Sequence, residues 1–348
     1  MNSNKIGTYV LVGLIIINVV LIFLIFTPFA AFMDKITGFY PVSTTLFVLG
    51  PPAPPNLTVW VEGRIDFENV SVRLNWTPSN STDVANYILY TTPNYSAGFD
   101  FSVPNLTLPN TTLTIVETNA SSFNELYYLL RANASYDLQD DNNKTWGILA
   151  RQLYNTSGGY NMVSIPVESL NRTIKEVFVQ NESDYYATLL FRRNDTTGDF
   201  EAAVYLGATV FHLDQWIGQF STVDPGFGYW IKVSRPYKFP AVGEVRVENR
   251  TKQLYNTTSV GNFVGWESVT REKIEDVVPN TLTDYNITRI DRRDDATGDF
   301  DTVIYLGATV FRIDAWAGQF DKFEPGYGYW LRTDENTVWT YEGNVRRT

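Results

Sequence analysis

The 348-residue chain contains no cysteine, only one histidine and no excess of basic charge. Without cysteine there are no disulfides, thiol nucleophiles or thiolate metal ligands, so other forces have to stabilise the fold. The formal net charge of −11 at pH 7 provides no basic surface to neutralise phosphates, which argues against nucleic acid as a partner. Aromatic residues make up 15% of the chain and Thr, Val and Tyr are abundant, a composition that favours β-strands.

Charge is also absent from one long stretch near the N-terminus, residues 6–31. A helix of this length and apolarity can cross a hydrocarbon layer of about 30 Å. The apolar part of a cleaved signal peptide is shorter, about 7–15 residues, and Phe29-Ala30-Ala31 is a poor match to its cleavage site. We therefore predict a cytoplasmic tail at 1–5, a transmembrane signal anchor at 6–31, and a stalk or linker at 32–51.

Glycosylation sequons, Asn-x-Ser/Thr, are dense and occur only after the predicted anchor. The chain has 28 Asn, and because Ser plus Thr make up about a sixth of it, chance predicts about five sequons. Such sites mark surface positions of exported proteins, so we predict N-linked glycans and an extracellular location for everything beyond about residue 35. The 17 candidate acceptors are Asn56, Asn69, Asn75, Asn80, Asn94, Asn105, Asn110, Asn119, Asn133, Asn143, Asn155, Asn171, Asn181, Asn194, Asn249, Asn256 and Asn286.

The combination of many sequons with no cysteine also bears on the origin of the chain. Exported proteins of animals commonly use disulfides. A cysteine-free, sequon-rich chain fits a surface protein of an archaeon, or of a virus of such a host, better than an animal receptor.

Short strands separated by turn-rich segments follow a stiff proline-rich linker at 51–55. Residues 70–76 and 127–132 alternate as expected of half-buried strands. The region resembles a fibronectin type III domain over about 52–150, which implies a seven-stranded sandwich of two sheets. Such domains are usually spacers or adhesion modules. The motifs that carry the resemblance are Pro54-Pro55-Asn56-Leu57-Thr58, Val72-x-Leu74-x-Trp76, Asp83-x-x-x-Tyr87-x-Leu89-Tyr90 and Tyr127-Tyr128-x-Leu130-x-Ala132.

The rest of the chain is an internal duplication. Residues 185–234 and 285–334 are identical at 26 of 50 positions at an offset of 100, and Gln152-Leu-Tyr-Asn-Thr recurs from Gln253 after a one-residue slip. Two similar β-rich domains are therefore predicted, at 151–240 and 247–345, joined by Arg235 to Gly243. Each is expected to have one short helix, at 169–178 and 269–278. Each is also expected to have a hairpin turn, at Thr197-Gly198 and Thr297-Gly298, with glycine at positive φ.

Three motifs in the first copy resemble a small β-rich module of bacterial and archaeal secreted proteins that often follows fibronectin type III domains. They are Gly159-Tyr-Asn-Met-Val-Ser-Ile-Pro166, Asp195-x-Thr-Gly198 and Pro225-Gly-x-Gly-Tyr-Trp230. The second copy departs from the first motif, with Gly265-Trp266 where the first has Ser164-Ile165. This resemblance implies architecture and an exported setting only. The predicted fold class is thus mostly β: an N-terminal helix, a β-sandwich and two tandem β-rich domains.

The sequence contains few candidate catalytic residues. A Ser-His-Asp triad would have to use His212, which the second copy replaces with Arg312. Carboxylates recur near the predicted hairpin turns, where hard oxygens could coordinate calcium, but the spacing does not fit an EF-hand and aspartate also caps turns without an ion. We predict no enzyme and no cofactor other than this calcium alternative. The calcium candidates are Asp195, Asp199, Glu201, Asp295, Asp299 and Asp301.

Aromatic residues recur at matched positions of the two copies. They could form a sugar-stacking platform, although buried aromatics more commonly supply the core of a small domain. The residues are Trp216, Tyr229, Trp230, Trp316, Tyr329 and Trp330.

The sequence as a whole predicts a membrane-anchored, N-glycosylated extracellular protein with a structural or adhesive role. One alternative is a subunit of an extracellular filament or virion surface spike whose N-terminal helices pack together. Another is a carbohydrate-binding surface protein. The expected partners are the membrane, through 6–31, and other surface proteins or further copies of the chain.

Overall fold

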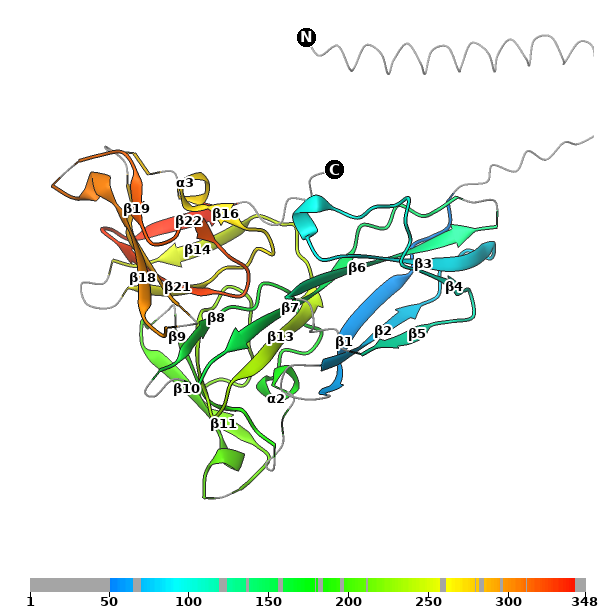
Figure 1. Ribbon diagram of the computed structural model, residues 1–348, viewed down its shortest axis with the longest axis horizontal. Coiled ribbons are helices and arrows are strands. Elements are labelled where there is room, and N and C mark those ends of the chain that lie inside the picture. Colours follow the sequence, from blue (N-terminus) through cyan, green and yellow to red (C-terminus); the bar gives the residue numbers. More distant parts are fainter. Residues whose placement is uncertain are drawn as a thin grey trace, which may run out of the picture. The chain divides into compact units, whose positions relative to one another are not determined.

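The computed structural model describes residues 51–64, 70–118, 124–135, 138–155, 159–178, 180, 184–194, 197–210, 212–256, 261–278, 280–281, 285–294, 297–310 and 312–341. All of them belong to one compact unit, Pro51–Thr348 (Figure 1). The predicted tail, the anchor and the stalk up to residue 50 lie outside the described residues. Among the residues that are described, no helix is long and apolar enough to span a membrane. The unit is mostly β, as predicted.

Seven strands form a sandwich of two sheets in the N-terminal part of the unit. One sheet has the order β1-β2-β5, and the other contains β7-β6-β3-β4. The alternation predicted in β2 is confirmed, because Val72, Leu74 and Trp76 are buried between the sheets and Asn75 is exposed. The strands are β1 (Asn56–Arg64), β2 (Val70–Thr77), β3 (Val84–Thr92), β4 (Leu106–Pro109), β5 (Thr114–Glu117), β6 (Glu125–Ala134) and β7 (Thr145–Leu153), with a 3₁₀ turn η1 (Tyr95–Ala97).

Strand β6 differs from its predicted pattern because it is buried on both faces. Tyr128 and Leu130 point into the sandwich core. Tyr127 and Leu129 are also fully buried, in a second core that the sheet shares with the first repeat. The half-buried alternation predicted for this strand was therefore wrong, because the first repeat covers the face that would otherwise meet water.

Strand β13 (Tyr237–Glu244) connects the first repeat to the same sheet. This segment was predicted to be a connection, but it pairs antiparallel with β7 from Tyr237↔Leu153 to Glu244↔Trp146. The predicted domain boundary at residue 150 lies inside β7. In the second repeat the equivalent strands, β14 (Arg250–Leu254) and β22 (Thr337–Tyr341), form a separate two-stranded sheet among the described residues. The first repeat therefore begins and ends within the sheet of the sandwich.

The two repeats contain sheets of the same strand order. That order is β11-β10-β9-β12-β8 in the first repeat and β19-β18-β17-β21-β15 in the second. The first comprises β8 (Asn161–Val163), α2 (Ile174–Val177), β9 (Ala187–Arg193), β10 (Phe200–Tyr205), η3 (Leu206–Ala208), β11 (Trp216–Gly218) and β12 (Tyr229–Val233). The second comprises β15 (Asn262–Gly265), β16 (Glu272–Lys273), α3 (Ile274–Val277), β17 (Ile287–Arg293), β18 (Phe300–Tyr305), η4 (Leu306–Ala308), β19 (Trp316–Gly318), β20 (Lys322–Phe323) and β21 (Gly328–Thr333).

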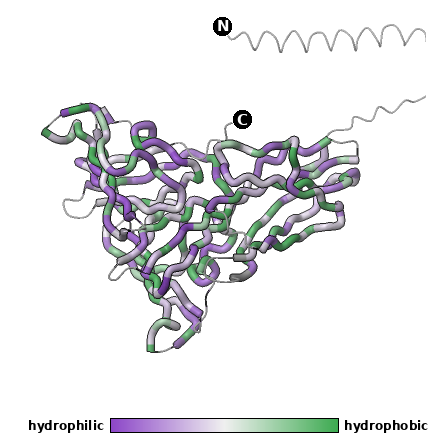
Figure 2. The backbone as a smooth tube through the Cα atoms, viewed as in Figure 1, coloured by the Kyte–Doolittle hydropathy of each residue, from purple (hydrophilic) through white to green (hydrophobic). Residues whose placement is uncertain are grey.

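Local predictions for the repeats agree with these elements. The short helices α2 and α3 fall inside the two predicted ranges. Gly198 and Gly298 have φ of 78° and 77° in the turns between β9 and β10 and between β17 and β18. Each repeat also buries its own set of apolar side chains, such as Leu190 in the first and Ile290 in the second. Figure 2 shows hydrophobic and hydrophilic residues interleaved along the strands, as expected for sheets that have one buried and one outer face.

Candidate functional site

The sequon asparagines are strongly biased towards the surface. Fourteen of the 17 are described, and 11 of these are exposed: Asn56, Asn75, Asn80, Asn94, Asn105, Asn110, Asn143, Asn155, Asn171, Asn249 and Asn256. Asn194 and Asn286 are half-buried, and Asn133 is buried. Asparagines outside sequons provide an internal comparison: Asn124 and Asn336 are exposed, whereas Asn86, Asn142, Asn161, Asn262 and Asn280 are not. Exposure therefore follows the sequon and not the residue type.

The calcium candidates do not gather into one described cluster. Asp195 and Asp295 lie outside the described residues, and Asp199 and Asp299 are exposed. Glu201 and Asp301 instead pair with arginines of the neighbouring strand, at 2.7 Å from Arg192 and 3.2 Å from Arg292. Among the described residues no group of three carboxylate or histidine side chains is close enough together to hold a metal ion.

Glu201 has a lowered pKa in this setting. Burial opposes its ionisation, but hydrogen bonds from Arg192 and from Asn194, whose Nδ2 lies 2.7 Å away, hold the pKa of the carboxyl below its ordinary value. The carboxylate is thus a structural partner that ties β10 to β9 at neutral pH.

The matched aromatic residues have three different environments. Tyr229 and Tyr329 are buried core residues. Trp216 and Trp316 are half-buried and pack at the edge of the cores. Trp230 and Trp330 meet each other where the two repeats touch, with ring centroids 6.3 Å apart in an edge-to-face arrangement. The third environment was not predicted from the sequence.

Phenylalanine side chains complete this aromatic contact in a reciprocal manner. Phe200 of the first repeat stacks on Trp330 of the second, with centroids 6.2 Å apart. Phe300 of the second repeat lies 6.2 Å from Trp230 of the first. Each repeat therefore offers the same phenylalanine to the same tryptophan of the other, which is the pattern of a two-fold, isologous interface.

Backbone hydrogen bonds across the contact follow the same exchange. The Ser164 N–H donates to the Gly326 carbonyl at 2.9 Å, and the Gly265 N–H donates to the Gly226 carbonyl at 3.1 Å. Ser164 and Gly265 are equivalent in the duplication, as are Gly226 and Gly326. Both acceptor glycines have positive φ, 85° and 80°, a conformation that side chains with a Cβ rarely adopt.

Cations over aromatic rings form a third reciprocal pair. The guanidinium of Arg151 lies 3.6 Å from the ring centroid of Tyr327. Its counterpart Lys252 has its Nζ 4.3 Å from the ring centroid of Phe227. Aromatic, backbone and cation–π contacts together show that the repeats associate like the two subunits of a symmetric dimer.

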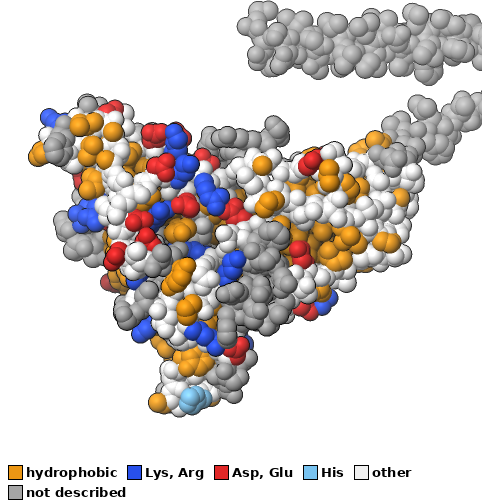
Figure 3. All heavy atoms as spheres, viewed as in Figure 1, with side chains coloured by type: hydrophobic (Ala, Val, Ile, Leu, Met, Phe, Trp, Pro, Cys, Tyr) orange, Lys and Arg blue, Asp and Glu red, His pale blue; other side chains and the backbone are white. Residues whose placement is uncertain are grey.

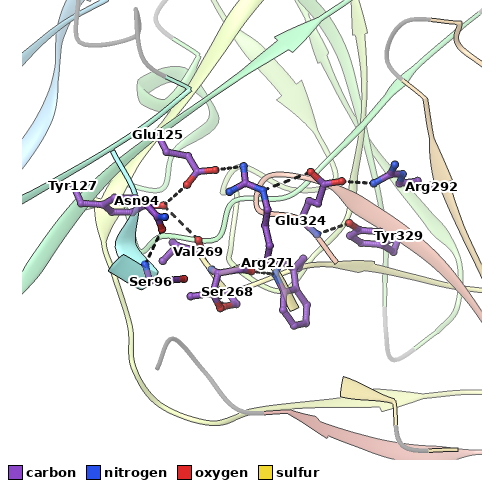
Figure 4. Close-up of polar contacts among 12 residues, drawn as sticks. Asn94, Ser96, Glu125, Tyr127, Ser268, Val269, Arg271, Arg292, Glu324 and Tyr329 are labelled. Atoms are coloured by element: carbon purple, nitrogen blue, oxygen red, sulfur yellow. Dashed lines mark hydrogen bonds and ion pairs between the residues drawn. The ribbon is translucent and has the colours of Figure 1, made fainter. Parts of the chain in front are cut away.

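A polar cavity of about 430 Å³ lies where the sandwich and both repeats meet. Four arginines and four acidic side chains line it: Arg151, Arg271, Arg292, Arg293, Glu125, Asp294, Asp301 and Glu324. Arg271 reaches the sandwich through Glu125, with 2.5 Å between Nη2 and Oε1, and its Nε lies 3.8 Å from Glu324 (Figure 4). Glu324 also pairs with Arg292 at 2.5 Å. A continuous chain of ion pairs therefore links the sandwich to the second repeat.

Part of this network is repeated and part is unique. Arg192, Asp224 and the Tyr229 hydroxyl of the first repeat occupy the positions of Arg292, Glu324 and the Tyr329 hydroxyl. Although burial opposes its charge, Tyr329, Glu324 and Asp301 raise the pKa of the Arg292 guanidinium, so it stays charged. Arg271 and Glu125, which join the units, were not recognised from the sequence, and neither belongs to a motif that could have revealed them.

His212 lies in the middle of the loop between β10 and β11 and is exposed. No hydrogen bond to its ring occurs within the described residues. Its place in the second repeat is taken by Arg312, which has the same backbone conformation, φ 48°. The position is thus defined by its backbone and not by imidazole chemistry.

Comparisons with known proteins add little to this geometry. No family model matches the chain, and no curated protein matches it in sequence. Among solved structures, the chain is similar to the crystal structure of chicken CNTN1 FN1-FN3 domains, at 11% sequence identity over 84% of this chain and 100% of that one. The TM-score is 0.20. That value carries no argument about fold or function.

Proposed function

We propose that the protein is a membrane-anchored, N-glycosylated extracellular surface protein with a structural or adhesive role. The exposure of the sequon asparagines carries this proposal. Eleven of the 14 described acceptors are exposed, whereas only two of the seven other described asparagines are. Glycan addition requires a surface position, so this difference is expected of a chain selected for modification and not of one with chance sequons.

The joints between the units support a structural role. A five-stranded sheet is shared between the sandwich and the first repeat through β7 and β13. The two repeats are held by a reciprocal aromatic interface, and Arg271 ties the second repeat to the sandwich. Shared strands and multiple joint contacts hold surfaces in fixed relative positions, which is what a spacer or scaffold needs and a hinged enzyme does not.

The fibronectin type III resemblance and the module resemblance support an exported setting. The sandwich has the seven strands and two sheets that the first resemblance implies. In this proposal the helix at 6–31 anchors the chain, residues beyond about 35 are outside, and catalysis is not involved. A filament or virion subunit remains the alternative within the same class, and it differs by what the N-terminal helices contact.

Peptide mass spectrometry of the protein purified from its native membrane or particle tests the proposal. We expect glycan masses on several of the exposed acceptors, for example Asn75, Asn105 and Asn143. Protease added to intact cells or particles should also remove everything beyond residue 35. A chain with no modified acceptor, or with its repeats protected from protease, would contradict the proposal.

A further inference from the structure

A groove lies between strand β1 of the sandwich and the segment of the first repeat that leads into α2. Its volume is about 770 Å³, within the range of about 300–1,000 Å³ that bound small molecules occupy. Figure 1 shows α2 beside β1 and β13, the strands that supply the other walls. Residues from opposite faces of β1 line the groove together, so it runs along the edge of this strand. The lining residues include Val59, Trp60, Val61, Asn171, Pro240 and Val242.

Strand β1 offers this groove an aromatic ring and an open edge. Leu57, Val59 and Val61 pack in the sandwich core, so the alternation of the strand places Trp60 on its other face. The indole is half-buried, and no other ring among the described residues packs on it. Because β1 is the outermost strand of its sheet, every second residue leaves its N–H and C=O without a partner in that sheet. A flat ring beside free backbone groups suits a ligand with apolar faces and hydroxyl edges.

The sequon asparagine Asn171 is held in place at the wall of the groove. Upstream of it, Glu168 and Glu244 exchange two backbone hydrogen bonds of 2.9 Å, which fix the chain on the end of β13. Downstream, the Thr173 N–H donates to the Asn171 Oδ1 at 3.2 Å and closes an Asx turn. The Nδ2, the atom that receives a glycan, donates to no group among the described residues. The acceptor atom is therefore both positioned and available.

Other exposed acceptors differ from Asn171 in the hydrogen bonding of the Nδ2. That of Asn110 donates to a backbone carbonyl at 2.8 Å, and that of Asn155 donates to one at 2.7 Å. The Nδ2 of Asn256 also donates to a backbone carbonyl. A glycan at these three positions disturbs an existing hydrogen bond, whereas a glycan at Asn171 disturbs none.

The lining of the groove favours a neutral ligand over an ion. Its two charged side chains already have partners, since Lys175 pairs with Asp214 at 3.2 Å and Glu176 accepts from the Thr173 hydroxyl. Leu170 also lines the groove and is 58% exposed, which folding of the repeat does not explain. An apolar wall with a few polar groups at its rim is typical of sites for uncharged molecules such as saccharides.

The second repeat shows what this position does when it carries a long side chain. Helices α2 and α3 begin at equivalent residues, Ile174 and Ile274, so Asn171 is aligned with Arg271. The Arg271 guanidinium reaches the sandwich and pairs with Glu125. Asn171 likewise faces the sandwich, but a groove separates its shorter side chain from β1. The same position of each repeat is thus directed at the sandwich, and only the second repeat spans the distance with protein atoms.

We infer that the N-linked glycan of Asn171 lies in this groove, stacks on Trp60 and hydrogen-bonds along the edge of β1. A saccharide then joins the first repeat to the sandwich, where the second repeat uses Arg271. On the face shown in Figure 3, charged side chains gather over the repeats, whereas hydrophobic and uncharged ones dominate over the sandwich, which suits a joint of this kind. The inference rests on the proposed function, because it requires the sequon to be occupied.

Hydroxyl-radical footprinting of Trp60 tests whether a glycan covers it. The full-length glycoprotein, made in its native host, would be compared with three variants by site-resolved mass spectrometry. Asn171→Gln and Thr173→Ala remove the glycan by different routes, and each should raise the oxidation rate of Trp60 about 3-fold or more. Thr173→Ser keeps the sequon and should leave that rate unchanged. Trp216, half-buried in the first repeat, serves as the internal control in every sample.

A double-mutant comparison asks whether the indole and the glycan act together. Trp60→Ala should lower the midpoint of thermal denaturation in the glycosylated chain, and by clearly less when Thr173→Ala is also present. Additive shifts, or a Trp60 oxidation rate that does not depend on the sequon, would overturn the inference; the footprinting result stands even if Trp60→Ala does not fold.

Occupancy of the sequons separates this inference from the proposed function. An unmodified Asn171 in a chain that carries glycans at other acceptors refutes the inference and leaves the proposed function intact. A chain with no modified acceptor refutes both.

Discussion

A Cβ built on Gly265 would lie 2.8 Å from the Cβ of Ser164, the residue at the equivalent position of the other repeat. Equivalent residues approach each other only near a symmetry axis. Two serines cannot both fit there, and the duplicated chain has one serine and one glycine. The departure of the second copy from the motif of the first therefore has a steric cause.

The first prediction follows from this approach. Gly265→Ser should lower the free energy of unfolding by about 1–3 kcal/mol, because extra atoms are forced into a filled interface. Adding Ser164→Gly should restore part of the loss, because it removes the contact with Ser164 but leaves the new side chain 2.4 Å from the backbone oxygen of Phe227. Urea denaturation of the unaltered chain and the two variants measures this. Equal destabilisation of the single and double variants would show that the pseudo-symmetry is not the cause.

The joint between the sandwich and the second repeat gives a second prediction. Glu125→Gln should lower the free energy of unfolding by about 1 kcal/mol, because Arg271 loses a charged partner at 2.5 Å whose side chain is mostly buried. Glu275→Gln breaks the Lys273–Glu275 pair, in which both side chains are more than half exposed, and should change stability by less than about 0.5 kcal/mol. If the two variants have the same thermal denaturation, the Arg271–Glu125 ion pair does not contribute more to stability than an exposed pair.

The lowered pKa of Glu201 predicts a dependence on pH. A carboxyl whose folded-state pKa is below its unfolded value stabilises the fold above the unfolded value, about 4.3, and loses that contribution as the pH falls through the folded-state pKa. Glu201→Gln should therefore cost about 1 kcal/mol at pH 7 and progressively less in acid. Denaturation curves at pH 7 and pH 3 test this. A difference that grows towards acid would have the wrong sign.

Asn133 gives a prediction about modification. It lies within β6, is only 8% exposed and is paired with Asn86 of β3. A glycan on its Nδ2 would have to displace the covering residues, so we expect this sequon to remain unmodified in the folded protein. Asn143, ten residues further along the chain, is exposed and serves as the positive control in the same mass spectrum. A glycan at Asn133 would contradict this prediction and would show that the residue is accessible to modification before β6 is buried.

Sequence patterns alone were sufficient for features that depend on neighbouring residues. The alternation in β2, the short helices within 169–178 and 269–278, and the positive φ of Gly198 and Gly298 all follow from periodicity and turn chemistry. The duplication was likewise readable from the offset of 100, and with it the expectation of matched aromatic positions. The sequons could be located, but not sorted into exposed and buried.

Only the tertiary structure decided how the units meet. Nothing local distinguishes Tyr237–Glu244 as a strand of the sandwich sheet, because its partner β7 lies more than 80 residues earlier and the pairing depends on where the first repeat ends. The same applies to Trp230 against Trp330 and to Arg271 against Glu125, whose ordinary residue types carry no signal of their own. The sequence determined the elements and their duplication through short-range chemistry. The joints depend on long-range packing that no window of the sequence contains.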